Sequence, residues 1–389
     1  MDMVNKNLKD KIRGSLIAGA IGDALGYPVE FCNYRDIQKR YGEKGIMRFD
    51  LKPHWIKEEK WTGKAIFSDD TQMTLFTACG LLNAERQNIP FIEGIKEAYL
   101  EWLTTQNSNY VLGNGQKCWI TSIPELNVRR APGNTCITSL QGIARRQTPV
   151  NNSKGCGGVM RIAPIPLFAA VDSRMTIEDA DKLAGEAAHL THHHPLGYIP
   201  AALMAHIIYR LVQDEQPSRI NLENYIHEGM EKVKQFYVLS KTSLRRMEQL
   251  VDAALTLSAN DQSDIENIEQ HLGGGWVAEE TLAIALYCTL RYFYDFEHAI
   301  IASVNHSGDS DSTGAVTGNI IGAIVGYDVI PHFYKEDLEL HDVILRIVDE
   351  ILRGKQNNDN EELIVNLTID GTEYEDIKVK VSSPEMEHE

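Results

Sequence analysis

The chain has 389 residues, of which 43% are apolar and 24% charged, and its formal net charge is −17. This composition is that of a soluble globular protein, and the acidic balance argues against a nucleic-acid partner, which usually needs a basic face. The six cysteines include no C-x-x-C pair, so neither a disulfide framework nor a zinc site is expected. We find no signal-peptide pattern and no apolar run of the roughly 20 residues that span a bilayer, so we expect a cytoplasmic protein without a membrane segment.

The first predicted element is a helix over residues 11–26 with a ridge of small side chains. Four small residues recur at intervals of four and therefore share one face: Gly14, Ala18, Gly22 and Gly26. Asp23 interrupts this face. We interpret it as a structural carboxylate, because a buried carboxylate needs hydrogen-bond partners.

Glu30 follows the proline that ends this helix and lies between Val29 and Phe31. A carboxylate in apolar surroundings is a candidate for a raised pKa and for acid–base catalysis. A solvated loop glutamate is the simpler alternative. Residues 41–64 then predict a long irregular loop, of the kind that often serves a function.

Hydroxyl and carboxylate side chains gather at two predicted helix starts. Ser68-Asp69-Asp70 precedes one apolar helix, and Asp309-Ser310-Asp311-Ser312 precedes another with glycines at 314, 318, 322 and 326. Each cluster could be an ordinary helix cap. Brought together, they would offer four carboxylates and at least two hydroxyls, which are hard ligands suited to two Mg²⁺ or Mn²⁺ ions. The two small-residue ridges would allow this by packing closely.

The other elements before residue 360 read as helices, so the core is predicted to be all-α. A glycine-rich loop, Ser153-Lys154-Gly155-Cys156-Gly157-Gly158, could cradle phosphates with its backbone N–H groups, with Lys154 or Arg161 adding charge. A structural turn is the alternative. Of the three histidines at 192–194, we expect one to face a pocket and the others to lie at the surface or in caps.

The C-terminal part has a different character. A polar linker precedes residues 363–369 and 372–381, which read as a β-hairpin with an Asp370-Gly371 turn. A lone hairpin is marginal in water, so we expect it to pack on the helical body or on another chain. We therefore divide the chain into a helical domain, residues 1–354, and an extension of linker, hairpin and disordered tail, residues 355–389.

Five motifs in order resemble those of the ADP-ribosylglycohydrolases, the relatives of the enzyme that reactivates ADP-ribosylated dinitrogenase reductase: Gly22–Gly26, Ser68–Thr71, Gly155–Arg161, Thr191-His192 and Gly308–Ser312. The resemblance covers about residues 10 to 353. It implies an all-α orthogonal bundle with a binuclear Mg²⁺ or Mn²⁺ cleft. It also implies cleavage of the N- or O-glycosidic bond that joins ADP-ribose to a protein side chain, usually arginine and in some members serine.

By position, the resemblance implies two sets of metal ligands, with Asp311 bridging: Ser68, Asp69 and Asp70 for one ion, and Asp309, Asp311 and Ser312 for the other. Ser68 and Ser312 stand where many members carry threonine, which keeps the hydroxyl. Glu30 matches the mobile loop glutamate of the family, and we expect it, or a metal-bound aspartate such as Asp69 or Asp311, to handle the proton.

The resemblance also implies a substrate-binding set. The segment Ser153–Gly158 matches the loop that holds the diphosphate, namely Ser153, Lys154, Gly155, Cys156, Gly157 and Gly158, and His192 matches a ligand-facing histidine. The expected partners are therefore ADP-ribose and an ADP-ribosylated protein. A further protein partner could contact the hairpin, whose role the resemblance does not cover.

We expect an ADP-ribosylhydrolase that reverses mono-ADP-ribosylation, with arginine the favoured linkage. A metal-dependent nucleotide phosphohydrolase is one alternative, because paired carboxylates serve that chemistry too. A non-catalytic protein is the other. It would bind ADP-ribose or mask a target, for example as an immunity protein against an ADP-ribosylating toxin, and the hairpin and the loop over 41–64 would serve it.

Overall fold

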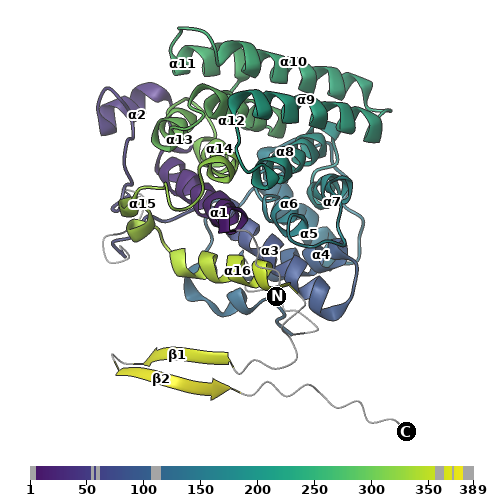
Figure 1. The fold of residues 1–389 in the computed structure, drawn as a ribbon, viewed down its shortest axis with the longest axis vertical. Helices are drawn as coiled ribbons and strands as arrows, with labels where there is room; N and C mark the ends of the chain where they lie inside the picture. Colours follow the sequence, from purple (N-terminus) through teal and green to yellow (C-terminus); the bar gives the residue numbers. More distant parts are fainter. Residues whose placement is uncertain are drawn as a thin grey trace. The chain divides into compact units, whose positions relative to one another are not determined.

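The computed structural model describes residues 6–53, 57, 62–106 and 115–354, together with the backbone of residues 363–369 and 372–379. The chain divides into two compact units, Met1–Leu352 and Arg353–Glu389. Within the described part of the first unit the long elements are all helices, which confirms the predicted all-α core (Figure 1). Their bounds are α1 Lys6–Gly26, α2 Tyr34–Tyr41, α3 Asp69–Gln87, α4 Phe91–Gln106, α5 Asn134–Ala144, α6 Pro164–Ala169, α7 Ile177–His189, α8 Pro195–Gln213, α9 Arg219–Phe236, α10 Lys241–Leu257, α11 Asp264–Asn267, α12 Ala278–Arg291, α13 Phe296–Val304, α14 Ser310–Val325, α15 His332–Asp337 and α16 His341–Arg353.

Helices α1 and α14 lie side by side and antiparallel at the centre of the first unit (Figure 1). Their small-residue ridges face each other, as predicted. A Cβ atom on Gly14 would lie 2.5 Å from the carbonyl oxygen of Gly322, and a Cβ on Gly318 would overlap the carbonyl of Ala18. Only glycine allows two helix backbones to approach so closely.

The close packing of α1 and α14 determines which ends meet. A Cβ on Gly26, the last residue of α1, would lie 2.6 Å from the backbone nitrogen of Asp311 in the first turn of α14. The chain then continues from Gly26 through a short 3₁₀ turn, Tyr27–Val29, to Glu30. The ridge therefore brings Glu30 to the N-terminus of α14.

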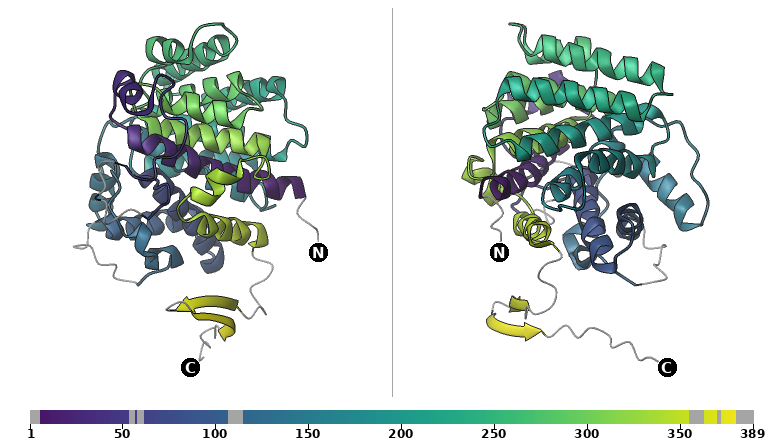
Figure 2. Two further views of the ribbon diagram at one scale, coloured as in Figure 1. Left: turned by 90° about the vertical axis from the view of Figure 1, so that its left-hand side faces the viewer. Right: turned by 45° about the vertical axis from the view of Figure 1, so that its right-hand side comes forward.

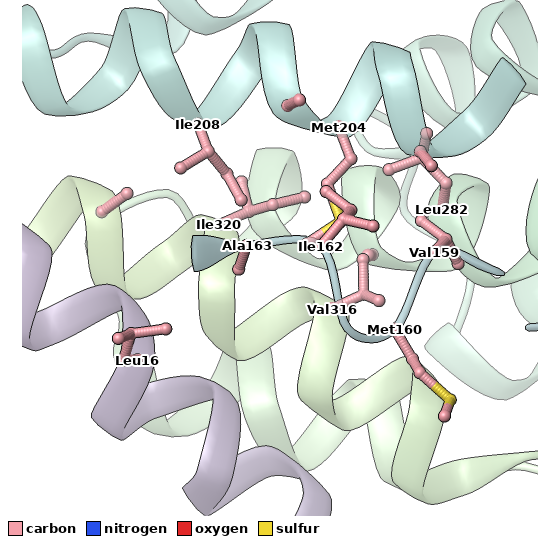
Figure 3. Close-up of a cluster of buried hydrophobic side chains, with 14 of the residues drawn as sticks. Leu16, Val159, Met160, Ile162, Ala163, Met204, Ile208, Leu282, Val316 and Ile320 are labelled. Atoms are coloured by element: carbon pink, nitrogen blue, oxygen red, sulfur yellow. The ribbon is translucent and has the colours of Figure 1, made fainter. Parts of the chain in front are cut away.

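Buried apolar side chains complete the core around this pair. Met204 and Ile208 of α8 point toward the segment 159–163 and toward Ile320 of α14 (Figure 3). Helix α9 packs on α8, and α10 packs on α8 and α12, at one end of the unit, while α3 packs against both α4 and α6 (Figure 1 and Figure 2). In the described part of the chain, α8 is the one helix long and apolar enough to cross a membrane, but 78% of its apolar window is buried, as in a core helix.

In the second unit, the strands β1 Leu363–Ile369 and β2 Thr372–Val379 pair in antiparallel register. Leu363 lies opposite Val379, and Ile369 lies opposite Thr372. Several predicted segments lie outside the described residues: the linker residues 355–362, the Asp370-Gly371 turn and the tail after 379. The same holds for residues 54–56 and 58–61 of the loop predicted over 41–64.

Candidate metal and active site

Asp23 of α1 anchors the start of α3. Its carboxylate accepts hydrogen bonds from the backbone N–H groups of Ser68, at 2.7 Å, and Thr71, at 2.9 Å, and from the Thr71 hydroxyl at 2.6 Å. Burial, followed by the neighbouring Asp311 carboxylate, raises the pKa of Asp23 to about 7. The structural interpretation of Asp23 is confirmed, because its oxygens bind the orphan donors of a helix N-terminus.

The first acidic cluster combines a cap with two directed carboxylates. The Ser68 hydroxyl accepts the Asp70 N–H at 3.2 Å, so Ser68 is the N-cap of α3. The Asp69 carboxylate accepts the Gly133 N–H at 3.3 Å. The Asp70 carboxylate accepts a 2.8 Å hydrogen bond from the hydroxyl of Ser312 on α14, so the two clusters meet, as predicted.

Glu30 joins the second acidic cluster. One carboxylate oxygen from each of Glu30, Asp309 and Asp311 lies within 4.8 Å of the others. Asp309 is the N-cap residue of α14, and Asp311 lies in its first turn, where it accepts the Ser312 N–H at 2.9 Å. The alternative in which Glu30 is a solvated loop glutamate is wrong, since its carboxylate faces two buried aspartates.

These carboxylates have shifted pKa values because they are buried and because they repel one another. Burial, then Asp311 and Asp309, raises the pKa of Glu30 to about 12. Burial, followed by the Asp311 carboxylate, raises the pKa of Asp69, Asp70 and Asp309 well above the ordinary value. Among the described residues, no basic side chain is a principal contributor to these shifts.

Such a cluster needs protons or cations to be stable, because like charges in a poorly hydrated site cannot all stay ionised. The donors are carboxylate and hydroxyl oxygens, the ligand type that Mg²⁺ and Mn²⁺ prefer. The residues present therefore fit divalent cations. The clustering supports a metal site, and the number and identity of the ions stay predictions.

The predicted phosphate loop packs tightly against its neighbours. The Ser153 hydroxyl accepts the Gly155 N–H at 3.3 Å, and the Cys156 N–H donates to the carbonyl of Trp276 at 3.2 Å. Lys154 forms an ion pair with the fully buried Glu279. The N–H groups of Ser153 and Gly158 also have acceptors, Asn151 Oδ1 and the Gly155 carbonyl, so four N–H groups of the loop are satisfied within the protein. Phosphate binding by this loop stays a prediction.

Arg161 does not serve a ligand. Its guanidinium is fully buried and donates to the Thr191 hydroxyl at 2.7 Å and to the carbonyl of Ala187 at 3.1 Å. It also lies 4.5 Å from the ring centre of Tyr99. The expectation that Arg161 adds charge to a phosphate site is wrong, because the core uses this cation to join α4 and α7.

His192 lies beneath the glycine-rich loop. His192 is 2% exposed, and a Cβ on Gly155 would lie 3.3 Å from its Nε2. Burial, assisted by Arg161, lowers the pKa of His192 to about 3, so the ring is neutral. His194, by contrast, serves as a helix cap, one of the two roles expected for the other histidines. His194 caps α8 by accepting the Leu196 N–H at 3.0 Å. A contact between His192 and a ligand stays a prediction.

Arg130 is a positioning residue that the sequence did not reveal. It is buried, forms a two-point ion pair with Glu339, and donates to the carbonyl of Phe67 at 2.9 Å. Its own carbonyl accepts the Asp69 N–H at 3.0 Å. Arg130 therefore fixes the position of residues 67–69, the segment that leads into the first acidic cluster.

The loop at 273–276 is a second feature that was missed. The sequence Gly273-Gly274-Gly275-Trp276 predicts a flexible loop, yet the carbonyl of Gly274 accepts the Asp309 N–H at 2.8 Å. The carbonyl of Trp276 accepts the Cys156 N–H. This loop therefore joins the acidic cluster at Asp309 to the predicted phosphate loop, and three consecutive glycines were its only local signal.

The sequence and the fold are similar to those of known proteins. The family model described as ADP-ribosylglycohydrolase matches residues 4–361, so the chain belongs to the ADP-ribosylglycohydrolase family. A solved structure described as an ADP-ribosylglycohydrolase-related protein complex has a TM-score of 0.58 and 20% identity, and the match covers 90% of this chain and 100% of that chain. The family resemblance predicted from the five motifs is confirmed, and the structural match shows the fold.

The names of two similar proteins describe hydrolases of ADP-ribose linkages. ADP-ribosylhydrolase ARH3 of Bos taurus is 30% identical over 212 residues, a match that covers 50% of this chain and 56% of that protein. The ADP-ribosyl-[dinitrogen reductase] glycohydrolase of Rhodospirillum rubrum is 23% identical, and the match covers 90% and 98% of the two chains. The match to ARH3 thus spans little more than half of that relative.

Proposed function

We propose that this protein is a metal-dependent ADP-ribosylhydrolase that releases ADP-ribose from a modified protein side chain, with arginine the favoured linkage. The observation that carries the proposal is the meeting of Glu30, Asp309 and Asp311 within 4.8 Å, in a member of the ADP-ribosylglycohydrolase family. The names of the two relatives support the same reaction class.

Two Mg²⁺ or Mn²⁺ ions would be held by the two predicted ligand sets: Ser68, Asp69 and Asp70, and Asp309, Asp311 and Ser312. When bound, such ions would hold ribose hydroxyls and lower the pKa of a water. The hydrogen bond between Ser312 and Asp70 supports a shared site. The ions would also compensate the negative ligands, which explains how an acidic protein can bind a diphosphate.

Glu30 is the residue we propose for proton transfer. In the reaction, a water oxygen bonds to the anomeric carbon and the bond to the side-chain nitrogen or oxygen breaks. One proton must leave the water, and one must reach the leaving atom. Glu30 lies on a loop beside the cluster, where burial raises the pKa of its carboxyl, so this group holds a proton near neutral pH that it can donate to the leaving atom. Asp69 and Asp311 are the alternative proton acceptors.

The remaining contacts concern the rest of the substrate. We propose that the segment Ser153–Gly158 lies along the diphosphate, with the neutral His192 beneath it. The Lys154 side chain is 39% exposed and keeps donors available on the loop despite its ion pair. The C-terminal hairpin is proposed as a contact for a protein partner, because two strands alone are marginally stable.

The products of the reaction test this proposal. The protein is incubated with arginine-linked and with serine-linked ADP-ribosylated proteins, with Mg²⁺ or with EDTA, and the products are separated chromatographically. Release of intact ADP-ribose from the arginine-linked substrate, abolished by EDTA, supports the proposal. Release of AMP or phosphate would indicate a phosphohydrolase. Retention of ADP-ribose without turnover would indicate a binding protein.

A further inference from the structure

Two exposed aromatic rings lie beside the acidic cluster and stack on each other. The ring centres of Phe31 and Trp276 are 5.2 Å apart, and the ring planes meet at 26°. Phe31 is 71% exposed and Trp276 is 42% exposed. Large aromatic side chains that are this exposed need an explanation when they lie together next to a site.

Phe31 belongs to the Glu30 loop and has an unusual backbone conformation. Its φ of 63° is in the left-handed region, which a bulky residue rarely adopts. The loop around it is short, since the Glu30 N–H donates to the Gly26 carbonyl and the Cys32 N–H donates to the Val29 carbonyl, both at 3.0 Å. A conformation of this kind persists only when neighbouring contacts hold it.

Trp276 lies on the 273–276 loop, whose backbone is hydrogen-bonded both to the acidic cluster and to the predicted phosphate loop. Its carbonyl accepts the Cys156 N–H at 3.2 Å, and the carbonyl of Gly274 accepts the Asp309 N–H at 2.8 Å. The ring of Trp276 is therefore attached, through two residues of backbone, to the start of α14. The Phe31 ring, which packs on Trp276, therefore has a fixed position relative to Asp309.

We propose that the stack of Phe31 on Trp276 is a latch that holds Glu30 at the cluster. Glu30 directly precedes Phe31, so separation of the two rings frees the loop that carries the Glu30 carboxylate away from Asp309 and Asp311. Phe31 and Trp276 are then positioning residues for proton transfer. This consequence for turnover rests on the proposed function, whereas the closure of the loop does not.

The latch predicts that three variants share one effect: Phe31→Ala, Trp276→Ala and the double variant. An aromatic stack contributes enough to shift a loop equilibrium by roughly 2- to 10-fold. We expect each variant to lower kcat by about that factor and to raise the rate at which a glutamate-specific protease cleaves after Glu30, measured by mass spectrometry of the fragment that ends there. The double variant should be no worse than either single variant, because both remove the same contact.

Two controls separate a latch from general damage. Trp276→Phe keeps an aromatic ring at this position. It should therefore retain most of the turnover and most of the resistance to cleavage after Glu30. Tyr294→Ala removes another exposed aromatic, one on the segment between α12 and α13, and should change neither quantity.

Unchanged cleavage at Glu30 in both single variants would overturn the latch, as would effects that add in the double variant. A Trp276→Phe variant that behaves like Trp276→Ala would also overturn it. If the wild-type protein hydrolyses no ADP-ribosylated substrate, the proposed function fails, and protease cleavage alone still decides whether the two rings hold the loop.

Discussion

The hydroxyl of Ser312 donates a 2.8 Å hydrogen bond to the carboxylate of Asp70, across 242 residues of sequence. This contact joins the first turn of α14 to the first turn of α3. It exists because the α1–α14 ridge fixes one helix start and Asp23 fixes the other. The predictions below follow from this convergence.

Asp311→Asn should nearly abolish hydrolysis. After burial, Asp311 contributes most to the raised pKa of each of the other acids, so it lies at the electrostatic centre of the cluster: Asp23, Glu30, Asp69, Asp70 and Asp309. Asp69→Asn should act in the same direction through one ligand set. Turnover is measured across a Mg²⁺ series, with the exposed Asp342→Asn as the control. Near-wild-type turnover of Asp311→Asn at low Mg²⁺ would contradict the two-metal site.

Glu30→Gln should keep the fold and the affinity for ADP-ribose but lower turnover by about 10²–10⁴-fold, the usual contribution of a general acid or base. Turnover and ADP-ribose affinity are measured on the same preparations. A loss of no more than a few-fold would indicate that Glu30 transfers no proton. A parallel loss of affinity would instead assign Glu30 to ligand binding.

Gly318→Ala and Gly22→Ala should each destabilise the protein, because a methyl group at either position overlaps a carbonyl of the facing helix. Overpacking of this kind typically costs about 1–3 kcal/mol or more. Gly142→Ala is the matched control. The nearest atom to its added Cβ lies at 3.7 Å, an ordinary contact. Equal melting temperatures for all three variants would show that the ridge tolerates side chains.

Stabilisation by Mg²⁺ should increase with pH. The raised pKa values of Glu30, Asp69, Asp70 and Asp309 mean that the metal-free native state holds protons that the unfolded chain, with carboxyl pKa values of about 4, has lost. The free energy of unfolding without metal therefore falls as the pH rises through this range. A cation replaces those protons, so the Mg²⁺-induced rise in Tm should be larger near pH 8 than near pH 5.5. A shift that stays constant or shrinks with pH would argue against cation binding by these groups.

Much of this site was predictable because its signals are local. Glycines at intervals of four identify a ridge on any helix, and a hydroxyl with two carboxylates at a helix start identifies either a cap or a ligand set. The structure confirms the cap at Ser68 and directs the Asp70 carboxylate to α14, while the ligand set stays a prediction. Long-range charge pairing left no such signal. Arg130 and Glu339 are 209 residues apart, and neither stands in a recognisable motif.

Arg161 shows how a local pattern misleads. A cation next to a glycine-rich loop resembles a phosphate ligand, but tertiary packing directs its guanidinium to Thr191, to Ala187 and to the face of Tyr99. Trp276 shows the opposite error. Three glycines suggest a flexible loop, while the backbone of that loop is hydrogen-bonded to Asp309 and Cys156. Burial and backbone partners decide both cases, and neither is visible in sequence spacing.

The central claim is that the cluster formed by Glu30, Asp309, Asp311 and the start of α3 needs divalent cations to release ADP-ribose. The most direct measurement titrates Mg²⁺ into EDTA-treated protein and follows the release of free ADP-ribose from an arginine-linked substrate. We predict no release without the cation, saturable recovery as Mg²⁺ is added, and no recovery for Asp311→Asn. Undiminished release in EDTA, or equal recovery in Asp311→Asn, would contradict the claim.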